Sequence, residues 1–220
     1  MTDHEKTLDI IFGRWRSQIL YVGVRLGVFD CVNSFPKNAS EIAKQLNLDY
    51  SLAYRLLRAL GSLGLLAEDV NRNFSITAQG QLLGKDHPQT LRGIALLEEG
   101  EEHYAIWKHL PSMIIDGKQN AFLREYGKKL FEYRDSNPPY REVFNQAMSS
   151  YSSIQTVWIS EALDGYDFSK IQHVCDVGGG QGHLLCSLLV KYPHLQGSVL
   201  ELDTVIKNKA LMGKENGRGR

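Results

Sequence analysis

The sequence predicts an α/β protein with a mainly helical N-terminal part and one β-α-β unit near its C-terminal end. Apolar residues recur at helical spacing through most of the first 160 residues. The pattern changes near 164–167, where polar residues and a glycine interrupt it. Two short apolar runs, 171–177 and 197–202, then flank a glycine-rich turn and a further helical pattern. This alternation is the repeating unit of a doubly wound parallel sheet.

The N-terminal helical pattern divides into one long stretch and two short helices. Apolar residues recur at helical spacing from 8 to 32, and we expect a break near Gly27 because glycine weakens a helix interior. A short helix follows, with Asn38 or Ser40 as its N-cap. Asp49 caps the next helix, since short polar side chains can accept hydrogen bonds from the first free N–H groups.

Two short runs rich in strand-forming residues come next. They cover 65–68 and 73–77 and flank a polar turn, which is the pattern of a hairpin. Thr77 then caps a helix over 78–83. Helices followed by a two-stranded wing make a winged helix-turn-helix, so we predict this arrangement for the N-terminal part.

Residues 90–160 are predicted to be mostly helical. One apolar stripe includes Trp107 and Met113, which we interpret as core because apolar side chains at helical spacing usually pack inward. A later helix over about 140–162 places Phe144 and Met148 on one face with other apolar residues.

The balance of charges gives no general attraction to nucleic acid or to anionic membranes. The chain has 25 basic and 25 acidic residues, and its first 100 residues hold eleven of each. A domain that neutralises several phosphates normally shows a basic surface. The helix that would enter a DNA groove carries Arg55 and Arg58 but is otherwise apolar or neutral. We therefore expect no nucleic acid partner.

Three widely spaced cysteines, Cys31, Cys175 and Cys186, indicate free thiols. The last two lie in apolar runs, so we expect them to be buried, and a reducing, cytoplasmic location follows. No apolar run reaches the roughly 18–20 residues that span a bilayer. Residues 1–6 lack the pattern of a signal peptide. We therefore predict a soluble protein with no membrane partner.

The glycine-rich turn has the spacing D-x-G-x-G-x-G. Glycines let a ligand lie against the backbone and permit φ angles that other residues resist, and the following helix offers unpaired N–H groups. The dinucleotide pattern G-x-G-x-x-G fails, because His183 or Leu185 stands where its third glycine is required. The phosphate-binding pattern G-x-x-x-x-G-K-[ST] does not match either, because no Gly-Lys pair follows at the required distance. The residues of the turn are Asp176, Gly178, Gly179, Gly180 and Gly182.

Acidic residues at the two strand ends indicate S-adenosyl-L-methionine as the ligand. This cofactor has no phosphate but carries an ammonium and a sulfonium group, which the carboxylate of Asp176 would attract. Glu201 ends the second strand, where an acidic side chain can accept both ribose hydroxyls. Asp203 would bind the ribose instead of Glu201 if the strand register differs by two residues. The alternative is that Asp176 and the glycines form only a tight β–α turn.

Short segments along the whole chain share their residues and their order with one known family. They are Leu26-Gly27-Val28-Phe29-Asp30, Glu41-Ile42-Ala43, Leu56-Leu57-Arg58-Ala59-Leu60, Gly64-Leu65-Leu66, Phe144-Asn145-Gln146-Ala147-Met148, Asp176-Val177-Gly178-Gly179-Gly180-Gln181-Gly182, Tyr192-Pro193 and Gly197-Ser198-Val199-Leu200-Glu201-Leu202. In this order they resemble the N-terminal two-thirds of the small-molecule O-methyltransferases that depend on S-adenosylmethionine. That family includes plant phenolic, hydroxyindole and bacterial antibiotic-tailoring enzymes.

The resemblance implies three parts. A mainly α, winged-helix dimerisation domain would cover 1–100, and a helical connector that lines the substrate pocket would cover 101–163. An incomplete Rossmann-like class I methyltransferase domain would cover 164–220. The resemblance also implies a homodimer in which the N-terminal domains intertwine and help to close the partner's pocket.

The same resemblance implies the roles of the site residues. S-adenosyl-L-methionine would lie over the turn from Asp176 to Gly182, with Glu201 on the ribose. Phe144 and Met148 would line the pocket for a small hydroxylated acceptor of phenolic or polyketide-like type. We assign no metal site.

Two departures from the family pattern bear on catalysis. The family usually has aspartate and proline where this chain has Glu201-Leu202-Asp203, so the ribose contact would be one methylene longer. In the family, the point matching Arg220 falls before the third strand, and the catalytic histidine comes later still. We therefore assign no catalytic residue and expect little transferase activity from these 220 residues alone. The histidines that do not match that base are His4, His87, His103, His109, His173, His183 and His194.

Two other classes of function stay open. One is a non-catalytic dimerisation partner that modulates a full-length enzyme, and cofactor titration would distinguish it. The other is a winged-helix DNA-binding regulator, which a salt-dependent gel shift would test. The sequence does not identify the acceptor.

Overall fold

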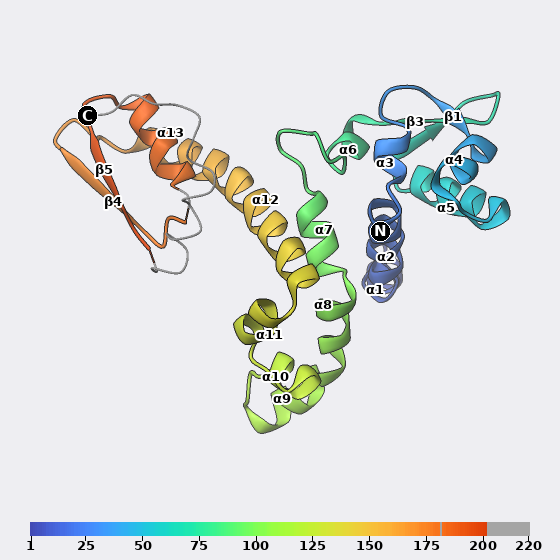
Figure 1. Cartoon of the computed structure of the whole chain (residues 1–220), viewed down its shortest axis with the longest axis horizontal. Helices are drawn as coiled ribbons and strands as arrows, with labels where there is room; N and C mark the ends of the chain where they lie inside the picture. The colour runs from blue at the N-terminus through green and yellow to red at the C-terminus, as the bar shows by residue number, and fades with distance from the viewer. Residues whose placement is uncertain (181, 202–220) are drawn as a thin grey trace. The chain divides into compact units, whose positions relative to one another are not determined.

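The computed structural model describes residues 1–180 and 182–201 (Figure 1). Its internal contacts divide the chain into two compact units, Met1–Ser150 and Tyr151–Arg220. The three-part division at 100 and 163 stays a prediction. Within the described part of the chain, no helix is both long enough and apolar enough to cross a membrane.

The long helical pattern over 8–32 forms parts of three helices. They are α1 (Asp3–Ile11), α2 (Gly13–Arg25) and α3 (Val28–Cys31). The expected break at Gly27 is confirmed, because this glycine has a φ of 76° and is the N-cap of α3. A second break at Phe12 was not predicted, since the apolar spacing continues across it.

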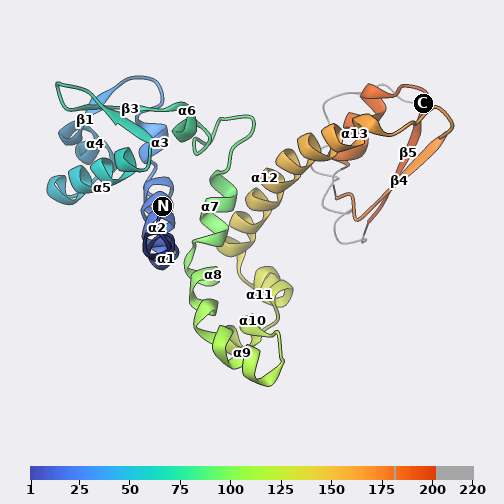
Figure 2. The same ribbon diagram turned by 180° about the vertical axis from the view of Figure 1, so that it is seen from behind.

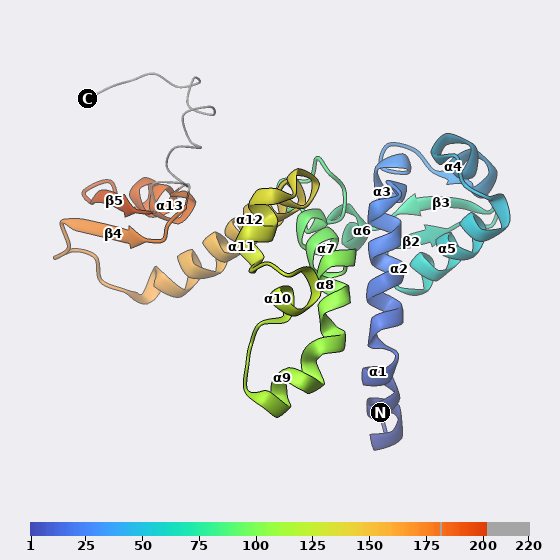
Figure 3. The same ribbon diagram turned by 60° about the horizontal axis from the view of Figure 1, so that its bottom comes forward.

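The winged-helix arrangement is confirmed, with one additional strand. Helices α4 (Ala39–Leu46) and α5 (Tyr50–Ser62) precede strands β2 (Leu66–Glu68) and β3 (Asn73–Ile76). Strand β1 (Lys37–Asn38) joins them in an antiparallel sheet of order β1-β3-β2. Figure 3 shows β2 and β3 beside α5.

Predicted caps hold the ends of these helices. The Asn38 side chain accepts the Glu41 N–H, and the Glu41 carboxylate accepts the Asn38 N–H in return. Asp49 accepts the Leu52 N–H, and Thr77 caps α6 (Ala78–Gln81) through the Gly80 N–H. The core between the helices and the sheet consists of fully buried apolar side chains. The largest are Val24, Val28, Phe29, Val32, Ile42, Leu57, Leu60 and Phe74.

A second helical group completes the first unit. Tyr140 and Ala147 of its last helix pack with Leu97 and Phe122 in a separate core. Gly93 lies so close to the backbone of Gln146 that an added Cβ would come within 2.5 Å of it. The helices are α7 (Arg92–Glu98), α8 (Glu101–Ile106), α9 (Leu110–Asp116), α10 (Ala121–Tyr126), α11 (Leu130–Ser136) and α12 (Pro138–Ala162), with a 3-10 turn at Trp107–His109.

The core interpretation of Trp107 is wrong for this chain. Its side chain is 66% exposed, and Met113 is only half-buried. The helical spacing is present, but the buried apolar side chains of this group come from α7, α10 and α12. The stripe through Trp107 therefore lies on the surface of the isolated chain.

The second unit contains the predicted β-α-β element. Strands β4 (His173–Val177) and β5 (Gln196–Leu200) pair in parallel, with Cys175 opposite Ser198. Helix α13 (His183–Lys191) connects them and lies against the strand pair (Figure 2). Phe168, Leu188 and Leu195 form the buried core, and a 3-10 turn at Leu163–Gly165 precedes β4.

Two of the cysteines are not buried as predicted. All three cysteines are free, but only Cys31 is buried, and Cys175 and Cys186 are exposed. Side chains alternate along β4, and Val174 and Asp176 are half-buried while Cys175 is exposed. An apolar run predicts burial on both faces of a strand, but only alternate side chains of β4 are covered in the described residues.

Candidate functional site

The turn between β4 and α13 depends on its glycines. Gly178, Gly180 and Gly182 have φ angles of 75°, 54° and 77°. Side chains strain this left-handed conformation, so the turn favours glycine at all three positions. Gly182 is also the N-cap of α13, and the Cys186 N–H donates to its carbonyl at 2.9 Å.

Gly179 is required for a different reason. A Cβ at this position would overlap the carboxyl group of Asp176. The carboxylate at the end of β4 thus folds back over the turn, and only a residue without a side chain leaves room for it. Asp176 is half-buried there.

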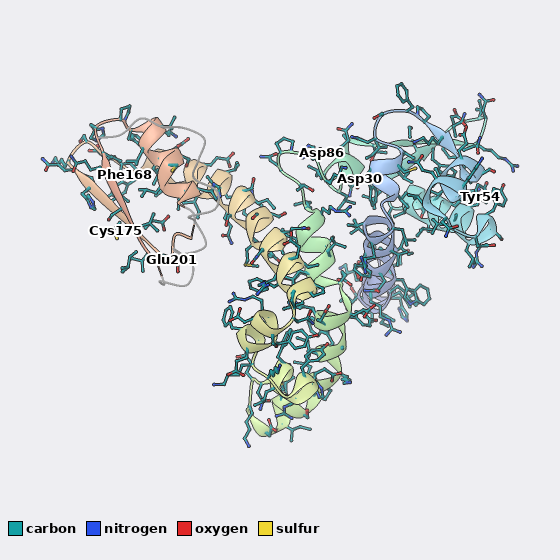
Figure 4. All side chains as sticks on the ribbon, viewed as in Figure 1. Asp30, Tyr54, Asp86, Phe168, Cys175 and Glu201 are labelled. Atoms are coloured by element: carbon teal, nitrogen blue, oxygen red, sulfur yellow. The ribbon has the colours of Figure 1, made fainter. Side chains whose placement is uncertain are left out.

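Glu201 reaches the same turn from the end of β5. Its Oε2 accepts the Gly180 N–H at 2.9 Å, and the neighbouring Leu200 carbonyl accepts the Gly178 N–H at 2.8 Å. Figure 4 shows Glu201 at the end of the strand pair. The structure therefore brings the glycine turn and Glu201 together at the carboxyl edge of two parallel strands, as in doubly wound folds that bind nucleosides. Asp203 lies outside the described residues.

Among the described residues, the surface over the turn is open. A Cβ built on Gly178 or Gly180 meets no atom of residues 1–180 and 182–201 within 4 Å. At the other end of the element, Leu185 packs so closely on Gly197 that an added Cβ would lie 2.7 Å from it. The helix is thus fixed against β5, while the backbone of the turn remains accessible. These features fit a flat nucleoside held between two carboxylates.

Phe144 and Met148 belong to α12 in the first unit, whereas the turn belongs to the second. Phe144 is half-buried against Tyr140 and Phe131, with ring centroids 6.2 and 6.3 Å away. Met148 lies one helical turn further along and is exposed. Their place beside the cofactor stays a prediction.

A cluster of polar groups around the buried Tyr140 was not predicted. His103 Nε2 lies 2.9 Å from the Tyr140 hydroxyl, and its Nδ1 lies 3.4 Å from the Glu98 carboxylate. Burial, with the nearby carboxylates of Glu102 and Glu98, raises the pKa of Tyr140, and burial raises that of Tyr126 to about 12. These residues come from four helices, α7, α8, α10 and α12, so no local spacing could have indicated the group.

One of the two arginines of α5 is paired within the domain. The Arg58 Nε lies 3.1 Å from the Glu68 carboxylate, and its Nη1 donates to the Tyr54 hydroxyl at 3.3 Å. The expectation that the chain has no nucleic acid partner stays a prediction. In the described ranges, no cluster of three His, Cys, Asp or Glu side chains could hold a metal ion.

Comparison with known proteins identifies the family. A model of the O-methyltransferase domain matches residues 107–216, and a model of the O-methyltransferase dimerisation domain matches 8–86. The chain belongs to this O-methyltransferase family. The family depends on S-adenosylmethionine, so the expected family, fold class and type of cofactor are confirmed.

Several relatives are tailoring enzymes of small molecules. Phenazine O-methyltransferase PhzM of Lysobacter antibioticus is 34% identical over 195 residues, which are 88% of this chain and 55% of that protein. O-demethylpuromycin-O-methyltransferase of Streptomyces alboniger is 30% identical over 90% of this chain and 52% of its own length. The chain thus spans about half the length of the curated relatives it matches.

Solved structures share the fold. The crystal structure of LaPhzM has a TM-score of 0.81 and 31% identity, over 97% of this chain and 64% of that chain. Human N-acetylserotonin methyltransferase in complex with SAM has a TM-score of 0.83 over 100% of this chain and 67% of its own, at 22% identity. The second likeness therefore concerns the fold alone.

Proposed function

We propose that this chain provides the dimerisation part and the cofactor-binding turn of an O-methyltransferase that modifies a small hydroxylated acceptor of phenolic or polyketide-like type. The observation that carries the proposal is the cluster of Asp176, Gly179, Gly180 and Glu201 under an open backbone surface. The names of the similar enzymes support the acceptor class.

Each carboxylate has a separate task in this proposal. Asp176, held over Gly179, attracts the ammonium group of the amino acid portion of the cofactor. Glu201, already placed against the Gly180 N–H, accepts the ribose hydroxyls. The glycines let the adenosyl group approach the backbone. S-adenosylmethionine, when bound, supplies an electrophilic methyl group, and the protein supplies binding and orientation.

Phe144 and Met148 provide the acceptor side of the proposal. An aromatic ring and a thioether on one face of α12 suit a flat, apolar acceptor. Methyl transfer also needs a group that takes the proton of the acceptor hydroxyl. No residue of this chain is assigned that role, so we expect the 220 residues to bind cofactor with little turnover. Turnover of a panel of phenols with labelled cofactor at the rate of a complete enzyme would contradict this expectation.

Calorimetric titration of the chain with S-adenosylmethionine tests the cofactor site. Asp176→Asn and Glu201→Gln should each weaken binding about tenfold, since each removes a charge-assisted contact worth roughly 1.5 kcal/mol. Glu161→Gln is the matched control, because Glu161 is an exposed carboxylate of the same unit away from the turn. Absence of binding by the unmodified, folded chain would favour a non-catalytic dimerisation partner instead.

A further inference from the structure

The junction of α11 and α12 holds an arginine between two aromatic rings. The Arg134 guanidinium carbon lies 5.0 Å from the Phe131 ring centroid and 5.5 Å from that of Phe144. The two rings meet edge to face, with centroids 6.3 Å apart at 74°. Cation–π attraction within about 6 Å favours this placement, so the rings fix the position of the guanidinium.

These rings continue into a surface that the core does not cover. Phe131 is 60% exposed and Met148 is 38% exposed, whereas Phe144 is half-buried. Phe144 and Met148 are four residues apart on α12, so they share one face of the helix. We call Phe131, Phe144 and Met148 the aromatic patch. Its flat rings and flexible thioether suit a planar aromatic ligand.

The guanidinium has hydrogen-bonding capacity left over. Its Nε donates to Asp135 Oδ1 at 2.8 Å, and its Nη2 lies 2.7 Å from the same oxygen in an ion pair. Arginine has five N–H donors, and no bond to Nη1 occurs within residues 1–180 and 182–201. The Arg134 side chain is 26% exposed, so it is partly desolvated and still reachable. A second carboxylate can therefore bind to this fork beside the aromatic patch.

We propose that Arg134 selects the acceptor, favouring flat aromatic hydroxyl compounds that also carry a carboxylate. The ring of the acceptor lies on the aromatic patch, and its carboxylate accepts hydrogen bonds from Arg134. This inference rests on the proposed function, in which Phe144 and Met148 line the acceptor pocket. It extends the proposed function because it assigns to Arg134 a preference for negatively charged acceptors.

A substitution of Asp135 tests the proposal in the opposite direction, because it should strengthen the binding of an anionic acceptor. Its carboxylate is bound to Arg134 and is 62% exposed, so it repels an incoming anion while it occupies part of the fork. Asp135→Asn should therefore strengthen the binding of an anionic acceptor, whereas Arg134→Gln should weaken it. A merely structural role of Arg134 predicts no such opposite pair of effects.

Fluorescence titration with 6-hydroxy-2-naphthoate and 2-naphthol provides the measurement, because these probes differ only in the carboxylate. The unmodified chain should bind the naphthoate about tenfold more tightly, as expected for one charge-assisted pair. Arg134→Gln should abolish this preference, and Arg134→Lys should retain part of it because the charge remains without the planar fork. Arg141→Gln, at an exposed arginine of α12, should leave the preference unchanged.

Equal affinity of the unmodified chain for both probes would overturn the proposal. Survival of the preference in Arg134→Gln would overturn it too, and so would the absence of binding by either probe. Circular dichroism checks that each variant is folded. Titration of the same samples with S-adenosylmethionine separates the two levels: intact cofactor binding without a naphthoate preference rejects the role of Arg134 and leaves the proposed function standing.

Discussion

At the scale of single residues, the turn after β4 combines two kinds of glycine. Gly178, Gly180 and Gly182 are needed for their backbone angles, whereas Gly179 is needed for the space that Asp176 occupies. The sequence pattern indicated the first reason. The second reason depends on the position of the Asp176 carboxylate in the folded protein, and residue spacing alone does not predict that position.

This difference leads to a prediction for Gly179→Ala. The added methyl group would displace the Asp176 carboxylate, and we expect the affinity for S-adenosylmethionine to fall about tenfold, or roughly 1.4 kcal/mol, by calorimetry. Gly165→Ala is the control, because a Cβ there meets no atom within 4 Å. An affinity unchanged by Gly179→Ala would show that the position of Asp176 does not matter for binding.

At the scale of elements, capping residues were predictable and some chain breaks were not. Asn38, Asp49 and Thr77 cap the helices that the sequence assigned to them. Their signal is local, because a short polar side chain bonds N–H groups two or three residues away. The two-residue strand β1 was missed, since it is defined only by pairing with Asn73 and Phe74, more than thirty residues away.

Two tyrosines of the first unit, Tyr126 of α10 and Tyr140 of α12, give a prediction for alkaline pH. The folded protein holds the protons of Tyr126 and Tyr140 more tightly than the unfolded chain does, because burial raises both pKa values. This stabilisation is complete below about pH 10, where unfolded tyrosines titrate, and is lost as the pH rises through about 12. Urea unfolding should therefore show a midpoint that falls over this range.

Variants test whether Tyr126 and Tyr140 cause this loss of stability at alkaline pH. Tyr126→Phe and Tyr140→Phe should each make the loss of stability above about pH 10 smaller. Tyr50→Phe, at an exposed position at the start of α5, should leave it unchanged. A decline of equal size in all three variants would mean that other groups cause it.

At the scale of the whole molecule, the exposed apolar residues of the first two helices support a dimer. Ile10 is 81% exposed, and Ile11 and Trp15 are more than half exposed. Monomeric proteins rarely leave large apolar patches in water. The match to a dimerisation domain over 8–86 includes these three residues.

We therefore expect the chain to sediment as a homodimer. Trp15→Glu should shift it towards monomer, because the charge would be buried in the interface. Val70→Glu is the control, since Val70 is fully exposed at the tip of the wing. Sedimentation velocity at several concentrations provides the measurement, and a Trp15→Glu dimer as stable as that of the unmodified chain would place the interface elsewhere.

Predictability also differs between local features and features that depend on distant parts of the chain. The turn at Asp176 to Gly182 and its β-α-β setting were predictable because they form one continuous stretch of sequence. The environments of Trp107, Cys175 and Arg134 were not, because each depends on which helices or strands lie against it. Apolar patterning indicates that a side chain prefers to be covered, but it does not say what covers it.

The bond from the Gly180 N–H to Glu201 has a consequence for the thermodynamics of ligand binding. A glycine-rich segment has much conformational entropy to lose, and ordering it at the moment of association would weaken the complex. Here the end of β5 already holds the segment in its left-handed shape. The entropy of the segment is therefore lost when the protein folds, and a nucleoside meets a preorganised surface.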